Sequence, residues 1–272
     1  MTIALPARAK LNLDLAVLGR RDDGYHDVRT TLQAIDLHDL LTLTPADRTA
    51  LSTSGLTVST THDNSVLKAL AALETATQQQ IPTRIHLHKR IPPGAGMGGA
   101  SSDAAAALGG LAKLHHITVD LPAIARQLGA DVPFFLAGGT AIAEQRGDHL
   151  TPIPTQPAWF AIAWPWIELL TQDVYRAWDE MSASPGKSPP LSGGGPGWGS
   201  GQIGTQLMKA AMHVEPRLEE FAASLGGDWQ MTGSGSAFFR RCTDEQSARE
   251  STLALQPLKC WTAVAQALGS GA

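Results

Sequence analysis

The sequence predicts an α+β fold built from two layered halves, and three observations carry this prediction. Apolar residues alternate with polar ones from Leu11 to Val17, with the period of a half-buried strand. Helical spacing of apolar residues begins at 64–80 and returns several times. A glycine-rich loop at 91–107, IPPGAGMGGASSDAAAA, joins a strand-like run to a helix. Opening strands followed by interleaved helices and strands are typical of an α+β layer sandwich.

The first half is expected to combine strands with a group of helices. A charged turn at 19–24 separates the first strand from a second extended run at 28–43, and the Ser/Thr-rich segment 48–61 contains strand-like patches. Another strand is expected at 84–90, where Ile85 and Leu87 alternate with polar residues. Helices are expected at 64–80, 104–115 and 120–128. The first should pack on the sheet and stop before Pro82.

A proline-rich connector at 150–157 is the expected boundary between two domains, 1–155 and 156–272. All seven tryptophans follow it, which indicates two cores of different composition. The Gly/Pro-rich segment 184–201 is expected to be a surface loop, with a lid as the alternative. The other expected elements are strands at 141–143, 159–164, 229–231, 237–241 and 261–265, and helices at 203–213, 215–225 and from 244 onward.

Composition indicates a compact globular enzyme. The 272 residues are 43% hydrophobic, which allows one large core or two small ones. The net charge of −4 and the pI near 6.1, with no segment rich in Lys and Arg, argue against nucleic-acid and membrane partners. Cys242 and Cys260 are expected to be buried free thiols. With charges in its first fifteen residues and no membrane-spanning segment, the chain is expected in the cytoplasm, as a monomer or homodimer.

The glycine loop has the chemistry of a phosphate-binding cradle. Glycines let backbone N–H groups converge on an anion, and the helix that follows adds unpaired N–H donors and about half a positive charge. A plain strand-to-helix turn, capped by Ser101, Ser102 or Asp103, is the alternative. No lysine follows the glycines as in a P-loop, and no acidic residue lies about twenty positions on as in a dinucleotide-binding unit.

Three segments carry a resemblance to the GHMP kinase superfamily. Residues 92–101 resemble its second motif, and the turn at 231–239, MTGSGSAFF, resembles its third. Residues 6–43, including the run GRRDDGYH, resemble the N-terminal motif of a branch whose acceptor is linked to cytidine diphosphate. The resemblance implies the two-domain GHMP kinase fold, with a ribosomal-protein-S5-domain-2-like N-terminal domain and a C-terminal ferredoxin-like α/β sandwich. It also implies an ATP-dependent kinase of isoprenoid precursor biosynthesis, with Mg²⁺ accompanying ATP.

The same resemblance implies two walls for the nucleotide. Taken alone, the second wall would be no more than a hairpin turn between short strands. The implied ATP-binding residues are Pro92, Pro93, Gly94, Ala95, Gly96, Met97, Gly98, Gly99, Ala100, Ser101 and Ser102 in the glycine loop, and Gly233, Ser234 and Gly235 in the turn.

Lys10 and Asp131 are the implied catalytic residues. Transfer of a phosphoryl group to an alcohol requires loss of the alcohol proton, which Asp131 would accept as a base. The Lys10 ammonium would keep that carboxylate ionised and stabilise charge on the acceptor oxygen. Without the resemblance, Asp131 would be expected to cap the helix beginning at Val132, and Lys10 to be a solvated strand residue.

The implied binding site for the acceptor comes from both halves of the chain. Tyr25 and Tyr175 would stack on the two faces of cytosine, and His26 would hydrogen-bond to its edge. The implied acceptor-binding residues are Asn12, Tyr25, His26, Thr171 and Tyr175. The segment 170–175, LTQDVY, matches its motif less fully, and at 204–207 the chain has Gly-Thr-Gln-Leu where members have Asn-Asp-Leu-Glu. No metal ligand is implied.

Two other functions stay open at this point. One is a different GHMP small-molecule kinase or decarboxylase, such as a mevalonate-type kinase, against which the GRRDDGYH run argues. The other is a nucleotide-binding sensor that has lost turnover, against which intact Lys10 and Asp131 argue.

Overall fold

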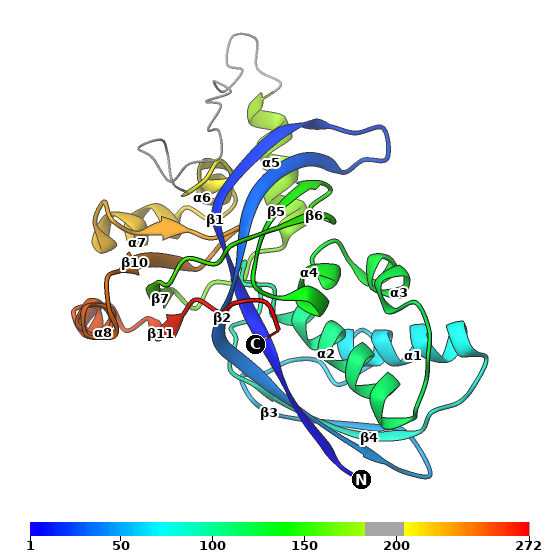
Figure 1. The fold of residues 1–272 in the computed structure, drawn as a ribbon. Coiled ribbons are helices and arrows are strands. Elements are labelled where there is room, and N and C mark those ends of the chain that lie inside the picture. Colours follow the sequence, from blue (N-terminus) through cyan, green and yellow to red (C-terminus); the bar gives the residue numbers. More distant parts are fainter. Residues whose placement is uncertain (183–203, 272) are drawn as a thin grey trace.

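The computed structural model describes residues 1–182 and 204–271, and its helices and strands confirm the α+β prediction (Figure 1). The chain forms two sheets, each packed against its own group of helices. The segment expected to be a surface loop, 184–201, lies outside the described residues. Within the described ranges, no helix has the length and apolar character needed to cross a membrane.

A long antiparallel hairpin forms the spine of the first sheet. Its strands, β1 (Ile3–Arg20) and β2 (His26–Pro45), confirm the two extended runs expected at the start of the chain. The sheet order is β3-β4-β2-β1-β8, with β5 paired to a separate stretch of β2 and β6 paired to β5. The remaining strands are β3 (Ala50–Gly55), β4 (Thr83–Lys89), β5 (Thr140–Gln145), β6 (His149–Ile153) and β8 (Gly204–Thr205).

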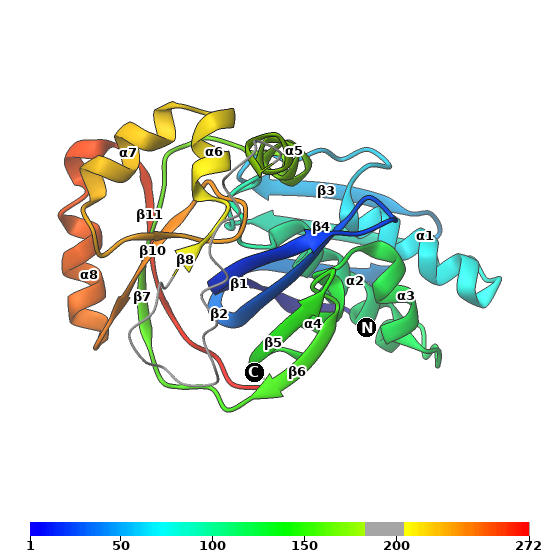
Figure 2. The ribbon, with the colours of Figure 1, turned by 90° about the horizontal axis from the view of Figure 1, so that it is seen from above.

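Four helices cover one face of this sheet (Figure 2). They are α1 (Ser65–Thr77), α2 (Gly99–Leu114), α3 (Leu121–Leu128) and α4 (Val132–Ala137). Helix α2 packs on β1 and β2, and α1 packs against α2 while its buried Leu73 shares a core with Ile85 of β4. Helix α1 ends well before Pro82, because Gln78 adopts the left-handed conformation with φ 54°.

The second sheet has the ferredoxin-like arrangement. Its order is β11-β7-β10-β9, so the fourth, first, third and second strands of this half lie side by side. The strands are β7 (Trp159–Trp164), β9 (Gln230–Met231), β10 (Phe238–Cys242) and β11 (Trp261–Gln266). The helices of this half are α5 (Thr171–Ser182), α6 (Met208–Val214), α7 (Arg217–Leu225) and α8 (Glu245–Leu253), with a short 3₁₀ helix at Gln256–Leu258.

The two halves share a core between their sheets. Along β7, Phe160 and Ile162 face Leu11 and Leu13 of the first sheet, whereas Ala161 faces the helices of the second half. Strand β8 pairs in parallel with β1, and the chain beyond β11 returns to hydrogen-bond with β2. The division into domains at residue 155 stays a prediction, and the two halves share buried side chains and strand pairing across it.

Two sequence expectations are wrong in detail. The connector at 150–157 begins as strand β6, and Pro152 is tolerated there because β6 is an edge strand that pairs only with β5 among the described elements. The helix expected at 203–213 starts only at Met208. The residues before it bond to β1 instead, with Gln206 N donating to Leu15 O at 3.0 Å and Val17 N donating to Gln206 Oε1 at 2.9 Å.

Candidate active site

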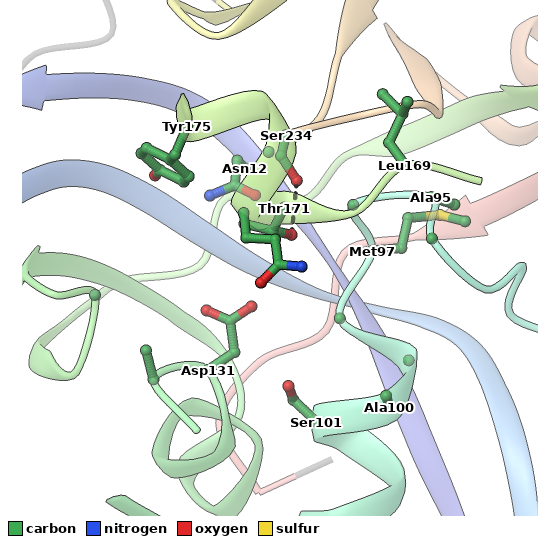
Figure 3. Close-up of a pocket in the computed structure, with 18 of the residues that line it drawn as sticks. Asn12, Ala95, Met97, Ala100, Ser101, Asp131, Leu169, Thr171, Tyr175 and Ser234 are labelled. Atoms are coloured by element: carbon green, nitrogen blue, oxygen red, sulfur yellow. Dashed lines mark hydrogen bonds between the residues drawn. The ribbon is translucent and has the colours of Figure 1, made fainter. Parts of the chain in front are cut away.

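An open cavity of about 1150 Å³ lies where the two halves meet. Its walls are the β1–β2 hairpin, the glycine loop leading into α2, the start of α4, helix α5 and the turn between β9 and β10. Figure 3 shows Asp131 and Ser101 pointing into it from one wall, with Thr171 and Tyr175 of α5 on the opposite wall.

The cavity brings together nearly all the residues expected in the site. Those that line it are Lys10, Asn12, Tyr25, His26, Asp131, Thr171, Tyr175, Gly233, Ser234 and every residue from 92 to 101. Ser102 does not line it, because the next step around α2 turns this side chain into the protein, where it is 2% exposed. Gly235 does not line it either, and its α-carbon faces the Met231 side chain.

The two glycine turns are locked against each other. Gly96 has φ 74°, and a Cβ there would lie 2.4 Å from the Thr232 carbonyl oxygen, so only glycine allows this approach. Ala237 N donates to Ala95 O at 3.1 Å, and Lys10 N donates to Met97 O at 3.1 Å. The expected nucleotide walls are therefore built as one unit together with the strand that carries Lys10.

The start of α2 leaves backbone N–H groups open toward the cavity. The helix is capped by Gly98, with φ 70°, and no described side chain bonds to its first turn, so the capping alternative for Ser101, Ser102 and Asp103 does not apply. The first helical bond is from Ser102 N to Gly98 O at 2.9 Å, which leaves the preceding N–H groups without a partner in the helix. These donors and the positive end of the helix dipole face the cavity.

Lys10 and Asp131, which both line the cavity, form an ion pair. Lys10 is 4% exposed, and its Nζ lies 3.8 Å from Asp131 Oδ2. Burial lowers the pKa of Lys10, and the Asp131 charge opposes that effect. Asp131 occupies the N-cap position of α4, yet its side chain makes no capping bond. Neither simple alternative holds, because the lysine is not solvated and the aspartate does not cap.

Asn12 fixes the position of the Lys10 ammonium. Its side-chain oxygen accepts a hydrogen bond from Lys10 Nζ, and its Nδ2 donates to Thr30 Oγ1 at 2.8 Å. Its backbone N donates to Thr232 Oγ1 at 2.9 Å, which ties β1 to the second glycine turn. Asn12 thus connects Lys10, Thr30 and Thr232 inside the protein. A separate contact joins α5 to the second glycine turn, where Thr171 Oγ1 lies 3.0 Å from Ser234 Oγ (Figure 3).

The aromatic residues at the far end of the cavity each already have a partner. The His26 ring stacks on Tyr175 with centroids 4.7 Å apart and planes 27° apart. Tyr25 is half exposed, and the Arg146 guanidinium lies 4.1 Å from the centre of its ring. Burial, with the Asp131 charge, raises the pKa of Tyr175, so its hydroxyl stays protonated. The rings at this end of the cavity are therefore held by contacts within the protein.

The comparisons with known proteins fit this geometry. Residues 64–139 match the family described as "GHMP kinases N terminal domain". A 4-diphosphocytidyl-2-C-methyl-D-erythritol kinase of Chromohalobacter salexigens is 35% identical over 90% of this chain and 85% of its own, and that of Moorella thermoacetica is 35% identical over 93% and 95%. A crystal structure of 4-(cytidine 5'-diphospho)-2C-methyl-D-erythritol kinase has 34% identity and a TM-score of 0.77, covering 98% of this chain and 100% of its own.

The chain belongs to the 4-diphosphocytidyl-2-C-methyl-D-erythritol kinase family. The matches to the GHMP family model and to this crystal structure confirm the GHMP kinase fold expected from the motifs. The GHMP match includes the glycine loop and Asp131, whereas Lys10 and the third-motif turn lie outside it.

Sequence reasoning missed a buried cluster beside the glycine loop of this kinase, and two of its members, Lys89 and Asp103, line the cavity. Lys89 Nζ contacts Asp39 Oδ2 and lies 2.7 Å from Asp103 Oδ2, and all three side chains are almost fully buried. Burial raises the pKa of Asp103 to about 7, although Lys89 opposes the shift. A signal was present, because Lys89 continues the alternation of Ile85 and Leu87 on the core side of β4.

Two further cavity-lining residues were also missed. Arg146, in the β5–β6 turn, and Asp179, on α5, line the cavity beside Tyr25 and His26. Asp179 bonds to His26 across 153 residues of sequence, and no local pattern could have indicated that contact.

Proposed function

We propose that this kinase transfers the γ-phosphoryl group of ATP to the 2-hydroxyl of 4-diphosphocytidyl-2-C-methyl-D-erythritol, a step of non-mevalonate isoprenoid precursor synthesis. The observation that carries the proposal is the Lys10–Asp131 pair, 3.8 Å apart and facing the cavity that the glycine loop lines. The names of the relatives supply the acceptor.

ATP would bind with its phosphates on the glycine loop. The N–H groups at the start of α2 donate to phosphate oxygens, and the helix dipole stabilises their charge. The turn that carries Gly233 and Ser234 would close the opposite side. Because the turns are held by backbone bonds to each other, these donors need little rearrangement when the nucleotide arrives.

The acceptor hydroxyl would lie between Asp131 and the γ-phosphorus. Asp131 accepts its proton as the oxygen attacks, and Lys10 stabilises the charge that develops on that oxygen. A buried ammonium held by Asn12 acts in a water-poor setting, where such stabilisation is stronger than in bulk solvent. The cytosine would bind at the other end of the cavity, against Tyr25, His26 and Tyr175.

Mg²⁺ would accompany ATP. The described residues contain no group of three or more His, Cys, Asp or Glu side chains that could form a preformed metal cage. Mg²⁺ does not need such a cage, because it keeps several waters and binds through substrate phosphates and one or two protein oxygens. The Ser101 hydroxyl, which lines the cavity, would supply one such protein oxygen. The ion would neutralise charge on the phosphates.

The test is ADP release measured with the cytidyl compound, mevalonate and homoserine as separate acceptors. We expect turnover with the cytidyl compound alone, and phosphate at its 2-position by NMR of the product. Faster turnover with mevalonate or homoserine would replace the proposal with another GHMP kinase activity. ATP binding without turnover of any acceptor would indicate a sensor.

A further inference from the structure

Asp179 joins the two walls at the acceptor end of the cavity. From α5 its Oδ1 lies 2.6 Å from His26 Nε2, and its Oδ2 lies 3.4 Å from Arg20 Nη1. Tyr175, one helical turn earlier on α5, stacks on the same His26 ring. The imidazole is thus held on its face by a tyrosine and on one nitrogen by a carboxylate.

This arrangement determines which nitrogen of His26 carries the proton. A carboxylate only accepts hydrogen bonds, so Nε2 must be the N–H donor. The Arg20 guanidinium holds the other oxygen of the carboxylate, and in the neutral imidazole with its proton on Nε2 the lone pair lies on Nδ1. Nδ1 has no hydrogen-bond partner among the described residues and is not a buried unpaired atom, and His26 lines the cavity. His26 Nδ1 is therefore available as a hydrogen-bond acceptor for a molecule in the cavity.

Cytosine and uracil differ at the position that such an acceptor would contact. Cytosine carries an exocyclic amino group, a donor, where uracil carries a carbonyl oxygen, an acceptor. The imidazole lies near-parallel to Tyr175, so a base stacked beside it on that tyrosine would present its edge to Nδ1. Nδ1 would bond to cytosine and would oppose the lone pairs of uracil.

We propose that Asp179 is a positioning residue that fixes the ring and tautomer of His26, and thereby makes the kinase select cytosine over uracil. The inference rests on the proposed function, since it deepens the choice of acceptor. Removing the carboxylate frees the imidazole to exchange its proton between Nδ1 and Nε2 and to rotate, so the selectivity falls while the remaining contacts persist.

The experiment compares CDP and UDP binding by calorimetry in the wild type, Asp179→Ala and Asp179→Asn. We expect the preference for CDP over UDP to fall by about tenfold in Asp179→Ala, with the ATP dissociation constant changed by less than about twofold. Asp173→Asn is the matched control, because Asp173 is on the same helix, 33% exposed and paired with Arg176 at 3.2 Å. It should leave the preference unchanged.

A ¹⁵N NMR spectrum of histidine-labelled protein gives a readout that a merely structural role would not move. The His26 signals, assigned by their loss in His26→Ala, should show the Nε2–H tautomer in the wild type and a mixture in Asp179→Ala. An equal loss of CDP and UDP affinity, or a wild-type Nδ1–H tautomer or imidazolium, would overturn the inference. Binding needs no turnover, so an inactive wild type that still prefers CDP would refute the proposed function and leave the selectivity role standing.

Discussion

Replacing Asp131 with asparagine gives the sharpest test of the catalytic pair. The substitution keeps the shape of the side chain and removes both its charge and its basicity. Because Asp131 makes no capping bond to α4, the substitution leaves the start of that helix intact. The change therefore acts at the cavity, on the base itself and on its ion pair with Lys10.

The expected size of the effect has two parts. Loss of a positioned general base typically lowers turnover by roughly 10²–10⁴-fold. The charge also acts on Lys10 from 3.8 Å, which corresponds to about 4 kcal/mol at an effective dielectric constant of about 20. Asp131 is 36% exposed, so solvent screening reduces this to about 1–2 kcal/mol. Without the Asp131 charge, the pKa of Lys10, which burial already lowers, should fall further.

Steady-state kinetics across a pH series, with ATP affinity from calorimetry, measure both parts. We expect kcat to fall by roughly 10²–10⁴-fold with the ATP dissociation constant near that of the wild type. Asp120→Asn is the matched control, because Asp120 caps α3 through Ala123 N at 3.0 Å and asparagine caps equally well. A kcat for Asp131→Asn within about threefold of the control would refute the assignment of the base.

Three further predictions follow from the same contacts. Gly96→Val should weaken ATP binding by at least about tenfold in calorimetry, because its Cβ would collide with the Thr232 carbonyl and force the two glycine turns apart, while CDP affinity stays unchanged. Tyr25→Ala should raise the acceptor KM by roughly ten- to hundredfold through loss of a stacking face, whereas Tyr25→Phe should be nearly silent; equal effects on ATP would mean that the residue supports the fold. Asp103, whose pKa burial raises from 3.8 to about 7, keeps a proton in the folded protein that the unfolded chain loses from about pH 4 upward. Its contribution to the free energy of unfolding is thus present at low pH and lost as the pH rises to about 7. The free energy of unfolding in urea, measured from about pH 4 to 7, should therefore fall with pH less steeply in Asp103→Asn than in the wild type. The same pH dependence in both proteins would contradict the shift.

The sequence by itself determined the features that arise from residues close together in the chain, such as strand alternation, the glycine loop and the start of α2. Alternation along β1 puts Leu11 and Leu13 in one core and leaves Lys10 and Asn12 on the opposite side, toward the cavity. A run of glycines before an alanine-rich segment produced the loop and the open start of α2, because backbone conformation and helix propensity act over a few residues. The superfamily motifs indicated the fold and the two turns.

Only the tertiary structure decided how distant residues pair and what burial does to them. Whether Asp131 caps a helix or meets Lys10 depends on where β1 lies, and the contact of Asp179 with His26 depends on α5 packing beside the first hairpin. Strand β8 and the buried pairing of Lys89 with Asp103 likewise follow from the joining of separate elements. Desolvation then alters the charge balance of the buried groups, and it arises from the whole packed fold, which no local pattern of residues can specify.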